Sequence, residues 1–212
     1  TIEVIKASVD GMEAQVNLDE AGCYEEPKII SEDTKLQDTY TKLQNYVNVV
    51  ITYDFGTEKE ILDGDIIIDW LIVDGDRVTF DHAMAEEYVS SLRKKYDTIF
   101  RKRTFQTSYG VEVTIDQGDY GWWMNTAQET EELIGMLERG ESGERVPVYW
   151  QTANSHETPD YGDTYVEINL TAQHLFLYQD GECILESDFV SGNPSRGNDT
   201  PAGIYGITYK ER

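Results

Sequence analysis

The chain has 212 residues, a length typical of one or two domains, and 39% of them are hydrophobic, with 14 Tyr, 6 Phe and 4 Trp. This aromatic content is enough for a packed core and excludes a disordered polar chain. The formal net charge of −24, from 41 acidic and 17 basic residues, excludes nucleic acid and anionic membrane surfaces as expected partners, because a polyanion repels both.

No targeting or membrane segment is visible in the sequence. The first residues, "TIEVIKASVDG", contain no initiator Met and no apolar signal-peptide stretch, so we expect the chain to be cut from a longer protein. No run of about 18 apolar residues occurs, so no contact of this segment with a membrane is expected. The two cysteines, Cys23 and Cys183, lack any metal-ligand spacing and are predicted to be unpaired structural thiols.

Helical and strand-like patterns are interspersed in the first part of the chain. An apolar stripe at helical spacing predicts a helix over residues 34–48, with the positions Leu36, Tyr40, Leu43 and Val47. The Asp74-Gly75 pair predicts a hairpin turn. Strand-like runs are present at residues 47–53, 110–116 and 119–125.

Two further helices carry end signals. Asp81 is the predicted N-cap of a helix whose buried face consists of Ala85, Val89, Leu92 and Tyr96. Thr126 and Glu129 have the spacing of a capping box and predict a third helix, which ends before Gly140. Because hairpins and helices mix without strict alternation, residues 1–152 are predicted to form one α+β domain.

The pattern changes after residue 152. Residues 153–163, "ANSHETPDYGD", are polar and aperiodic and are interpreted as a linker. Residues 164–212 are strand-like, with runs at 164–170, 173–179, 182–190 and 203–210, and a tight turn at Asp180-Gly181. About fifty residues of β-meander cannot bury a full sandwich core, so this segment is predicted to be an incomplete all-β unit with open strand edges.

Aromatic residues form the candidate ligand-binding site of the first region. Trp122 and Trp123 lie in a predicted strand, where neighbouring side chains point to opposite faces, so one indole is expected to face outward beside Tyr120. Such a surface can stack on a sugar or a peptide. In the alternative interpretation both indoles are covered, one by a helix and the other by the linker or the second region.

The remaining polar motifs predict no catalytic residue, no metal site and no cofactor. The Asp-rich turns at 63–65 and 74–76 do not continue into the twelve-residue calcium-loop pattern. The three histidines are scattered and have no Cys or Ser beside them in a nucleophile arrangement. Cys183 stands beside Glu182 and lacks the electropositive setting that activates a thiol.

A dense cluster of turn-forming residues occupies 190–207, "VSGNPSRGNDTPAGIYGI". No helix signal follows it, so it is not predicted to be a phosphate-binding loop. Gly192 and Gly203 are expected to provide backbone freedom in turns, and Pro201 to fix the entry to the next strand. The loop is interpreted as architectural, with contact to substrate as the alternative.

The segment that contains this loop resembles the start of the L,D-transpeptidase (YkuD-type) catalytic domain, found in the cysteine enzymes that cross-link peptidoglycan. Members open with I-x-I-D/N-L-x-x-Q-x-L-x-x-Y-x-x-G, a pattern met here by Ile168, Asn169, Leu170, Gln173, Leu175, Tyr178 and Gly181. A small-residue turn and the motif T-P-x-G-x-Y/F follow, met by Gly192, Thr200, Pro201, Gly203 and Tyr205.

The first region resembles the peptidoglycan-binding domain that precedes such catalytic domains in Gram-positive bacteria. The stretches that carry this resemblance are "ITYDFG", "IIDW", "YVSSLRKKYDT", "RTFQTSYGVEVTI" and "GDYGWWMN". The resemblance implies peptidoglycan, through its stem peptides or its glycan, as the partner. It also implies an extracellular location at the cell wall and a parent protein anchored in the membrane by a preceding segment.

One departure from the family limits what the resemblance implies. The family's nucleophile lies in a Ser-His-Gly-Cys-like stretch, and neither Cys23 nor Cys183 stands in that context. The chain is therefore interpreted as an L,D-transpeptidase truncated before its nucleophile and inactive alone. In the parent enzyme the resemblance implies that a His-activated cysteine attacks a stem-peptide carbonyl, releases D-Ala and forms a thioester that an amine resolves.

Two other interpretations stay open. Residues 1–152 can serve as a stand-alone, non-catalytic binding or spacer module. The chain can also be an unrelated acidic surface adhesin whose β-rich end mimics the family. The sequence leaves the oligomeric state open.

Overall fold

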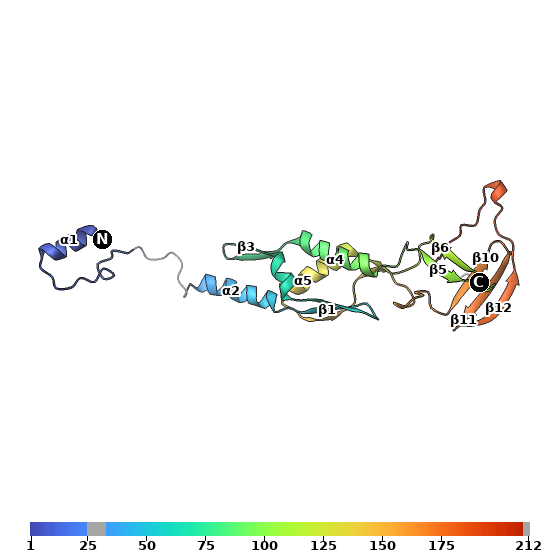
Figure 1. The fold of residues 1–212 in the computed structure, drawn as a ribbon, viewed down its shortest axis with the longest axis horizontal. Helices are drawn as coiled ribbons and strands as arrows, with labels where there is room; N and C mark the ends of the chain where they lie inside the picture. Colours follow the sequence, from blue (N-terminus) through green and yellow to red (C-terminus); the bar gives the residue numbers. More distant parts are fainter. Residues whose placement is uncertain (25–32, 210–212) are drawn as a thin grey trace.

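The computed structural model of the chain describes residues 1–24 and 33–209. The molecule is elongated: α2 (Thr34–Val47) and β3 (Leu71–Asp74) lie toward one end of the folded part, and β12 (Glu182–Asp188) lies at the other (Figure 1). The first helix, α1 (Ile2–Asp10), buries none of its residues. The parts that could position a site therefore lie within residues 33–209.

A three-stranded sheet and two helices form the core of the first region. In this sheet β1 (Ile51–Asp54) pairs antiparallel with β2 (Lys59–Leu62) and parallel with β8 (Gly143–Arg145). The helices α4 (His82–Tyr96) and α5 (Thr126–Glu138) pack against each other. Sheet and helices share one hydrophobic cluster, which includes Ile51, Tyr53, Leu62, Val89, Leu133 and Leu137.

Smaller elements extend this core on the side of α2. The short helix α3 (Gly64–Ile67) and the 3-10 helix η1 (Ile68–Trp70) lead into a hairpin of β3 and β4 (Arg77–Phe80). The turn predicted at Asp74-Gly75 is confirmed, because it connects these two strands. The helix predicted over 34–48 is also confirmed, since α2 ends one residue earlier.

The predicted helix ends are confirmed for α4 and only in part for α5. The carboxylate of Asp81 accepts hydrogen bonds from first-turn amides and is the N-cap of α4. The N-cap of α5 is Asn125, so the capping box predicted at Thr126 is wrong. The side chain of Glu129 turns into the core instead, because Tyr53 and Arg145 offer it buried hydrogen-bond donors.

The strands predicted in the middle of the chain are shorter than expected. The run at 110–116 corresponds to β6 (Glu112–Ile115), which forms a hairpin with β5 (Arg103–Gln106). The run at 119–125 is reduced to β7 (Trp123–Met124), which pairs with β9 (Tyr149–Gln151) across an irregular register. The glycine just before Trp122 has a φ of +139°, which interrupts the extended chain there.

The second region is a three-stranded antiparallel sheet in the order β10 (Tyr165–Asn169), β11 (His174–Gln179), β12. Every residue of β12 is exposed, so this strand is an open edge, as expected. The closing strand predicted at 203–210 is wrong for the described residues 203–209. There Ile204 forms a single bridge, because this segment runs beside the loop that contains Gly118 and not along the sheet. Residue 210 lies outside the described residues.

The hairpin β5–β6 packs on the sheet of the second region, although in sequence it belongs to the first. The ring of Phe105 contacts that of Tyr165, with centroids 5.8 Å apart, and Tyr109 contacts Phe176 at 5.6 Å. The hairpin and the sheet lie side by side at one end of the molecule (Figure 1). An α+β region followed by an all-β segment is the predicted fold class, and the structure confirms it.

Three features bear on localisation and chemistry. No helix in the part of the chain that the structure describes is long and apolar enough to cross a membrane. Within residues 1–24 and 33–209 no group of His, Cys, Asp and Glu is arranged to hold a metal ion. Cys23 and Cys183 are free thiols.

Candidate functional site

Trp122 is held by the segment that was interpreted as a linker. Its indole Nε1 donates a hydrogen bond of 2.8 Å to the carbonyl of Ser155. Its ring stacks on that of His156, with centroids 3.7 Å apart and an angle of 9° between the planes. Burial lowers the pKa of His156, so the stacked imidazole favours its neutral form. Trp122 therefore joins the linker to the core of the first region.

Tyr120 makes contacts with the same segment. Its hydroxyl accepts a hydrogen bond of 2.8 Å from the amide of Asn154 and donates a longer one, 3.4 Å, to the carbonyl of Asp160. The side chain is partly buried, and this burial raises its pKa. Two of the three predicted ligand-binding residues, Tyr120 and Trp122, thus have partners within the chain.

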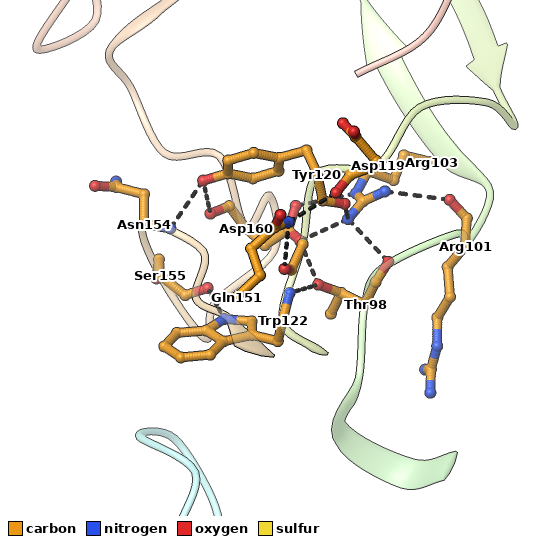
Figure 2. A network of polar contacts seen from close by, with 11 residues as sticks. Thr98, Arg101, Arg103, Asp119, Tyr120, Trp122, Gln151, Asn154, Ser155 and Asp160 are labelled. Atoms are coloured by element: carbon orange, nitrogen blue, oxygen red, sulfur yellow. Dashed lines mark hydrogen bonds and ion pairs between the residues drawn. The ribbon is translucent and has the colours of Figure 1, made fainter. Parts of the chain in front are cut away.

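The ion pair between Arg103 and Asp160 lies at the centre of this junction (Figure 2). The guanidinium binds the carboxylate through two hydrogen bonds, Nε to Oδ1 at 3.0 Å and Nη2 to Oδ2 at 2.7 Å. Nη2 also donates to the carbonyls of Thr98 and Tyr120, each at 2.9 Å. The side chains are 14% and 6% exposed. A bidentate, largely dry pair of this kind fixes the relative orientation of the elements that carry it.

Trp123 has a different environment from Trp122. Its ring is partly exposed and meets the ring of Phe100 edge to face, with centroids 6.2 Å apart. Phe100 is 65% exposed. All three predicted aromatic residues are partly exposed, and Trp123 differs from Trp122 because its ring contacts that of Phe100 and not that of His156.

The motif loop of the second region is held by side-chain hydrogen bonds. Gln173 donates from Nε2 to Ser191 Oγ at 2.8 Å and accepts from the amide of Ser191 at the same distance. The hydroxyl of Thr200 accepts from the amide of Gly192 at 3.0 Å and closes the base of the loop. A Cβ atom on Gly192 would lie 1.9 Å from the carbonyl oxygen of Asn198, so this approach requires glycine.

An open cavity of about 690 Å³ lies along this loop. Thr200 and Pro201 line it together with Gln173 and the segment 190–194. The predicted loop residues Gly192, Thr200 and Pro201 are thus brought together around one concave surface. Gly203 lies just outside it, next to the first region.

The end of the motif loop is attached to the first region through the main chain. The amide of Ile204 donates to the carbonyl of Gln117 at 3.0 Å, and the amide of Tyr120 donates to the carbonyl of Ile204 at 3.1 Å. A Cβ atom on Gly118 would lie 2.1 Å from the carbonyl oxygen of Ile204, and the φ of Gly118 is +106°. The chain that leads into Tyr120 and Trp122 is therefore in direct contact with the chain that leaves the motif loop.

Sequence reasoning missed the residues that join the two regions. Arg103 lies in a basic stretch that resembles an ordinary solvated surface, and Asp160 lies in a segment without periodicity. Glu167, whose carboxylate accepts from the amide and hydroxyl of Ser108 at 2.9 and 2.5 Å, reads as a polar position of an amphipathic strand. No local pattern identifies such pairs, because their partners are more than fifty residues apart in sequence.

Two families match adjoining parts of the sequence. Residues 30–145 match the family described as "Putative peptidoglycan binding domain", and residues 163–212 match the "L,D-transpeptidase catalytic domain". No protein among the curated ones compared matches the sequence. The two matches define a class of two-part proteins in which a putative peptidoglycan binding domain precedes an L,D-transpeptidase catalytic domain.

Two solved structures are similar to the chain. The crystal structure of a cysteine-to-serine mutant of Enterococcus faecium L,D-transpeptidase is 32% identical, with a TM-score of 0.58 over 78% of this chain and 66% of that one. The Ldtfm–avibactam carbamoyl enzyme is 33% identical, with a TM-score of 0.59 over 79% and 65%. The chain belongs to the L,D-transpeptidase family, and it spans just under two thirds of the length of these two relatives.

Proposed function

We propose that this chain serves peptidoglycan cross-linking by a cell-wall L,D-transpeptidase. Residues 1–152 bind and position the polymer, and residues 164–212 supply strands and the motif loop of the catalytic domain. The observation that carries the proposal is the junction between the two regions, in which the β5–β6 hairpin and the Arg103–Asp160 pair hold both as one piece. A polymer held by the first region is thereby kept at a fixed place relative to the motif loop.

The reaction proposed for the intact enzyme is a two-step acyl transfer. A cysteine thiolate attacks the carbonyl between the L-centre and D-Ala of a stem peptide, the C–N bond breaks, and D-Ala leaves with a proton from a histidine. The amine of a second stem then attacks the thioester and gives a proton to the histidine, and the C–S bond breaks as the thiolate leaves. Backbone amides that stabilise the oxyanion lower the barrier of both steps.

Neither cysteine of this chain is assigned the role of nucleophile. Cys183 lies on the exposed edge strand β12, with its Sγ 3.7 Å from the carbonyl of Leu185. The histidine of the same sheet, His174, is engaged with Asp188 at 2.7 Å. A thiol without a base in reach lacks the arrangement that activates a cysteine.

Intact-mass spectrometry with avibactam tests this assignment. We expect the 212-residue chain to gain no carbamoyl mass, while iodoacetamide labels the exposed thiol of Cys183 and shows that it is free to react. A carbamoyl adduct on Cys23 or Cys183 contradicts the assignment. Replacement of Cys183 by Ser identifies the modified thiol.

The binding role is tested by cosedimentation of the chain with purified peptidoglycan sacculi. We expect the chain to be retained. If it stays in the supernatant, the second candidate function applies, in which residues 1–152 act as a non-catalytic spacer. The specific observation in favour of the spacer is that Tyr120 and Trp122 are hydrogen-bonded to Asn154 and Ser155 of the linker.

A further inference from the structure

The exposed ring of Phe100 and the partly exposed ring of Trp123 contact each other on the first region and are called here the outer aromatic pair. Phe100 is 65% exposed, and its ring meets that of Trp123 edge to face. Trp122 turns toward the linker and contacts the ring of Tyr149, with centroids 4.9 Å apart. Successive residues of an extended chain point to opposite sides, so Trp123 faces away from this packed side.

The indole of Trp123 has unused hydrogen-bonding capacity. Its N–H has no hydrogen-bond partner among residues 1–24 and 33–209, whereas the N–H of Trp122 is satisfied by Ser155. An indole usually finds a partner for its N–H when it is buried, and an exposed one presents an apolar ring and a donor together. The strand β9, which pairs with β7, carries another tryptophan, Trp150, which is 66% exposed.

Positive charge is concentrated next to Phe100, in contrast to the rest of the chain. Residues 93–103, "RKKYDTIFRKR", contain six of the 17 Lys and Arg residues of a chain whose net charge is −24. Four of the six are within 4.0 Å of a carboxylate, whereas Lys94 and Arg101 have none that close among residues 1–24 and 33–209. Arg101 donates a hydrogen bond to the main-chain carbonyl of Lys94, which holds its guanidinium at the end of α4.

We propose that the outer aromatic pair, with Lys94 and Arg101, binds the glycan strand of peptidoglycan through a sugar ring and, where the stem peptide has been removed, through the carboxylate that this removal leaves on the sugar. This inference rests on the proposed binding function and names its ligand and its surface. A sugar ring offers a flat C–H face that packs on an aromatic ring, hydroxyls that accept from the Trp123 N–H, and an acidic substituent that pairs with the two cations. The surface is open, which suits an extended polymer better than an enclosed small molecule.

The test uses the 212-residue chain and glycan strands that an amidase has freed from their stem peptides. Binding is measured by cosedimentation and by titration of the tryptophan fluorescence. We expect Phe100→Ala and Trp123→Ala each to weaken binding about fivefold to tenfold, as loss of one aromatic contact implies. We expect Lys94→Gln to weaken binding at low salt and to reduce its salt dependence.

The matched control is Tyr40→Ala, which removes a ring that is 59% exposed on α2, an element that carries neither member of the outer aromatic pair. Its binding should equal that of the wild type. The exposed ring of Phe100 is expected to contribute little to the stability of the core. Phe100→Ala should therefore weaken binding and leave the thermal midpoint of unfolding unchanged.

The possible outcomes distinguish a failure of the proposed glycan-binding site from a failure of the proposed binding function. If wild type and both aromatic variants bind glycan strands equally, the outer aromatic pair is not the site, and the binding function stands. If the chain cosediments with whole sacculi, or binds soluble stem peptides in the fluorescence titration, but does not bind glycan strands, the glycan strand is the wrong ligand. If the chain binds neither sacculi, stem peptides nor glycan strands, the proposed binding function is wrong as well.

Discussion

Replacement of Arg103 by Met tests whether the junction between the two regions is rigid. The change removes a charge that is 14% exposed and leaves the carboxylate of Asp160, 6% exposed, without its cation. The carbonyls of Thr98 and Tyr120 also lose a donor. Breaking a buried ion pair from one side costs about 3–5 kcal/mol. Water can enter at a junction more easily than in a core, so we expect about 3 kcal/mol.

Urea unfolding followed by tryptophan fluorescence measures this cost. Trp122 is a suitable reporter because its main-chain amide and its indole both bind residues of the junction, Thr98 and Ser155. Arg139→Met is the matched control, since Arg139 forms an exposed pair with Glu141 and should leave the midpoint unchanged.

A double-mutant cycle separates the pair from its surroundings. In Arg103→Met with Asp160→Leu no charge is left buried alone, so the double variant should be more stable than Arg103→Met by about 1–2 kcal/mol. Two results refute the reasoning: a loss below about 1 kcal/mol for Arg103→Met, or a double variant whose loss equals the sum of both single losses.

Three further predictions concern single contacts. Burial lowers the pKa of His156 from its ordinary 6.5, so the folded protein binds a proton at this residue less readily than the unfolded chain does. The free energy of unfolding is therefore unaffected by His156 above pH 6.5 and decreases as the pH falls from 6.5 toward the lowered pKa. Fluorescence-detected unfolding against pH should show this loss in the wild type and not in His156→Phe. Gly118→Ala should speed amide exchange of Ile204 at least about tenfold, while Gly143→Ala, whose Cβ meets open space, should not. Glu129→Leu should cost about 3–5 kcal/mol in urea unfolding, because it leaves the buried guanidinium of Arg145 without its inner carboxylate; a loss under 1 kcal/mol contradicts this.

The elements with strong local signals could be predicted from the sequence. The stripe of α2, the N-cap at Asp81 and the turn at Asp74-Gly75 each depend on residues close together in the chain, and the structure confirms them. The capping box at Thr126 failed for a non-local reason. Asn125 can cap the same helix, and the buried donors Tyr53 and Arg145 compete for the Glu129 carboxylate.

The closing strand failed for a related reason. The segment that follows Gly203 has the composition of a strand, but strand formation requires a partner with free main-chain groups. Here Gln117 and Tyr120 provide those groups to Ile204 alone. The alternation of side chains in a sequence predicts an extended segment, but it does not identify the strand with which that segment would pair.

The candidate site was predicted at the level of residue type, and its surroundings were not. The sequence indicated that Trp122 and Trp123 point to different sides, and the structure places only Trp122 against the linker. Which of the two contacts the linker depends on where Ser155 and His156 fold, more than thirty residues away. The contact of Phe100 with Trp123 could not be predicted either, because the two residues are far apart in the sequence.

The position of the β5–β6 hairpin has a consequence for how such proteins can be rearranged. A recombination or cloning boundary drawn in the polar segment 153–163 separates the hairpin from the sheet on which it packs. One product would expose Phe105, which is 8% exposed here, and the other would expose Phe176, which is 9% exposed. When the second region is exchanged between homologues, the β5–β6 hairpin must therefore be exchanged with it. The two segments to be exchanged are separated in the gene by the sequence that encodes α5.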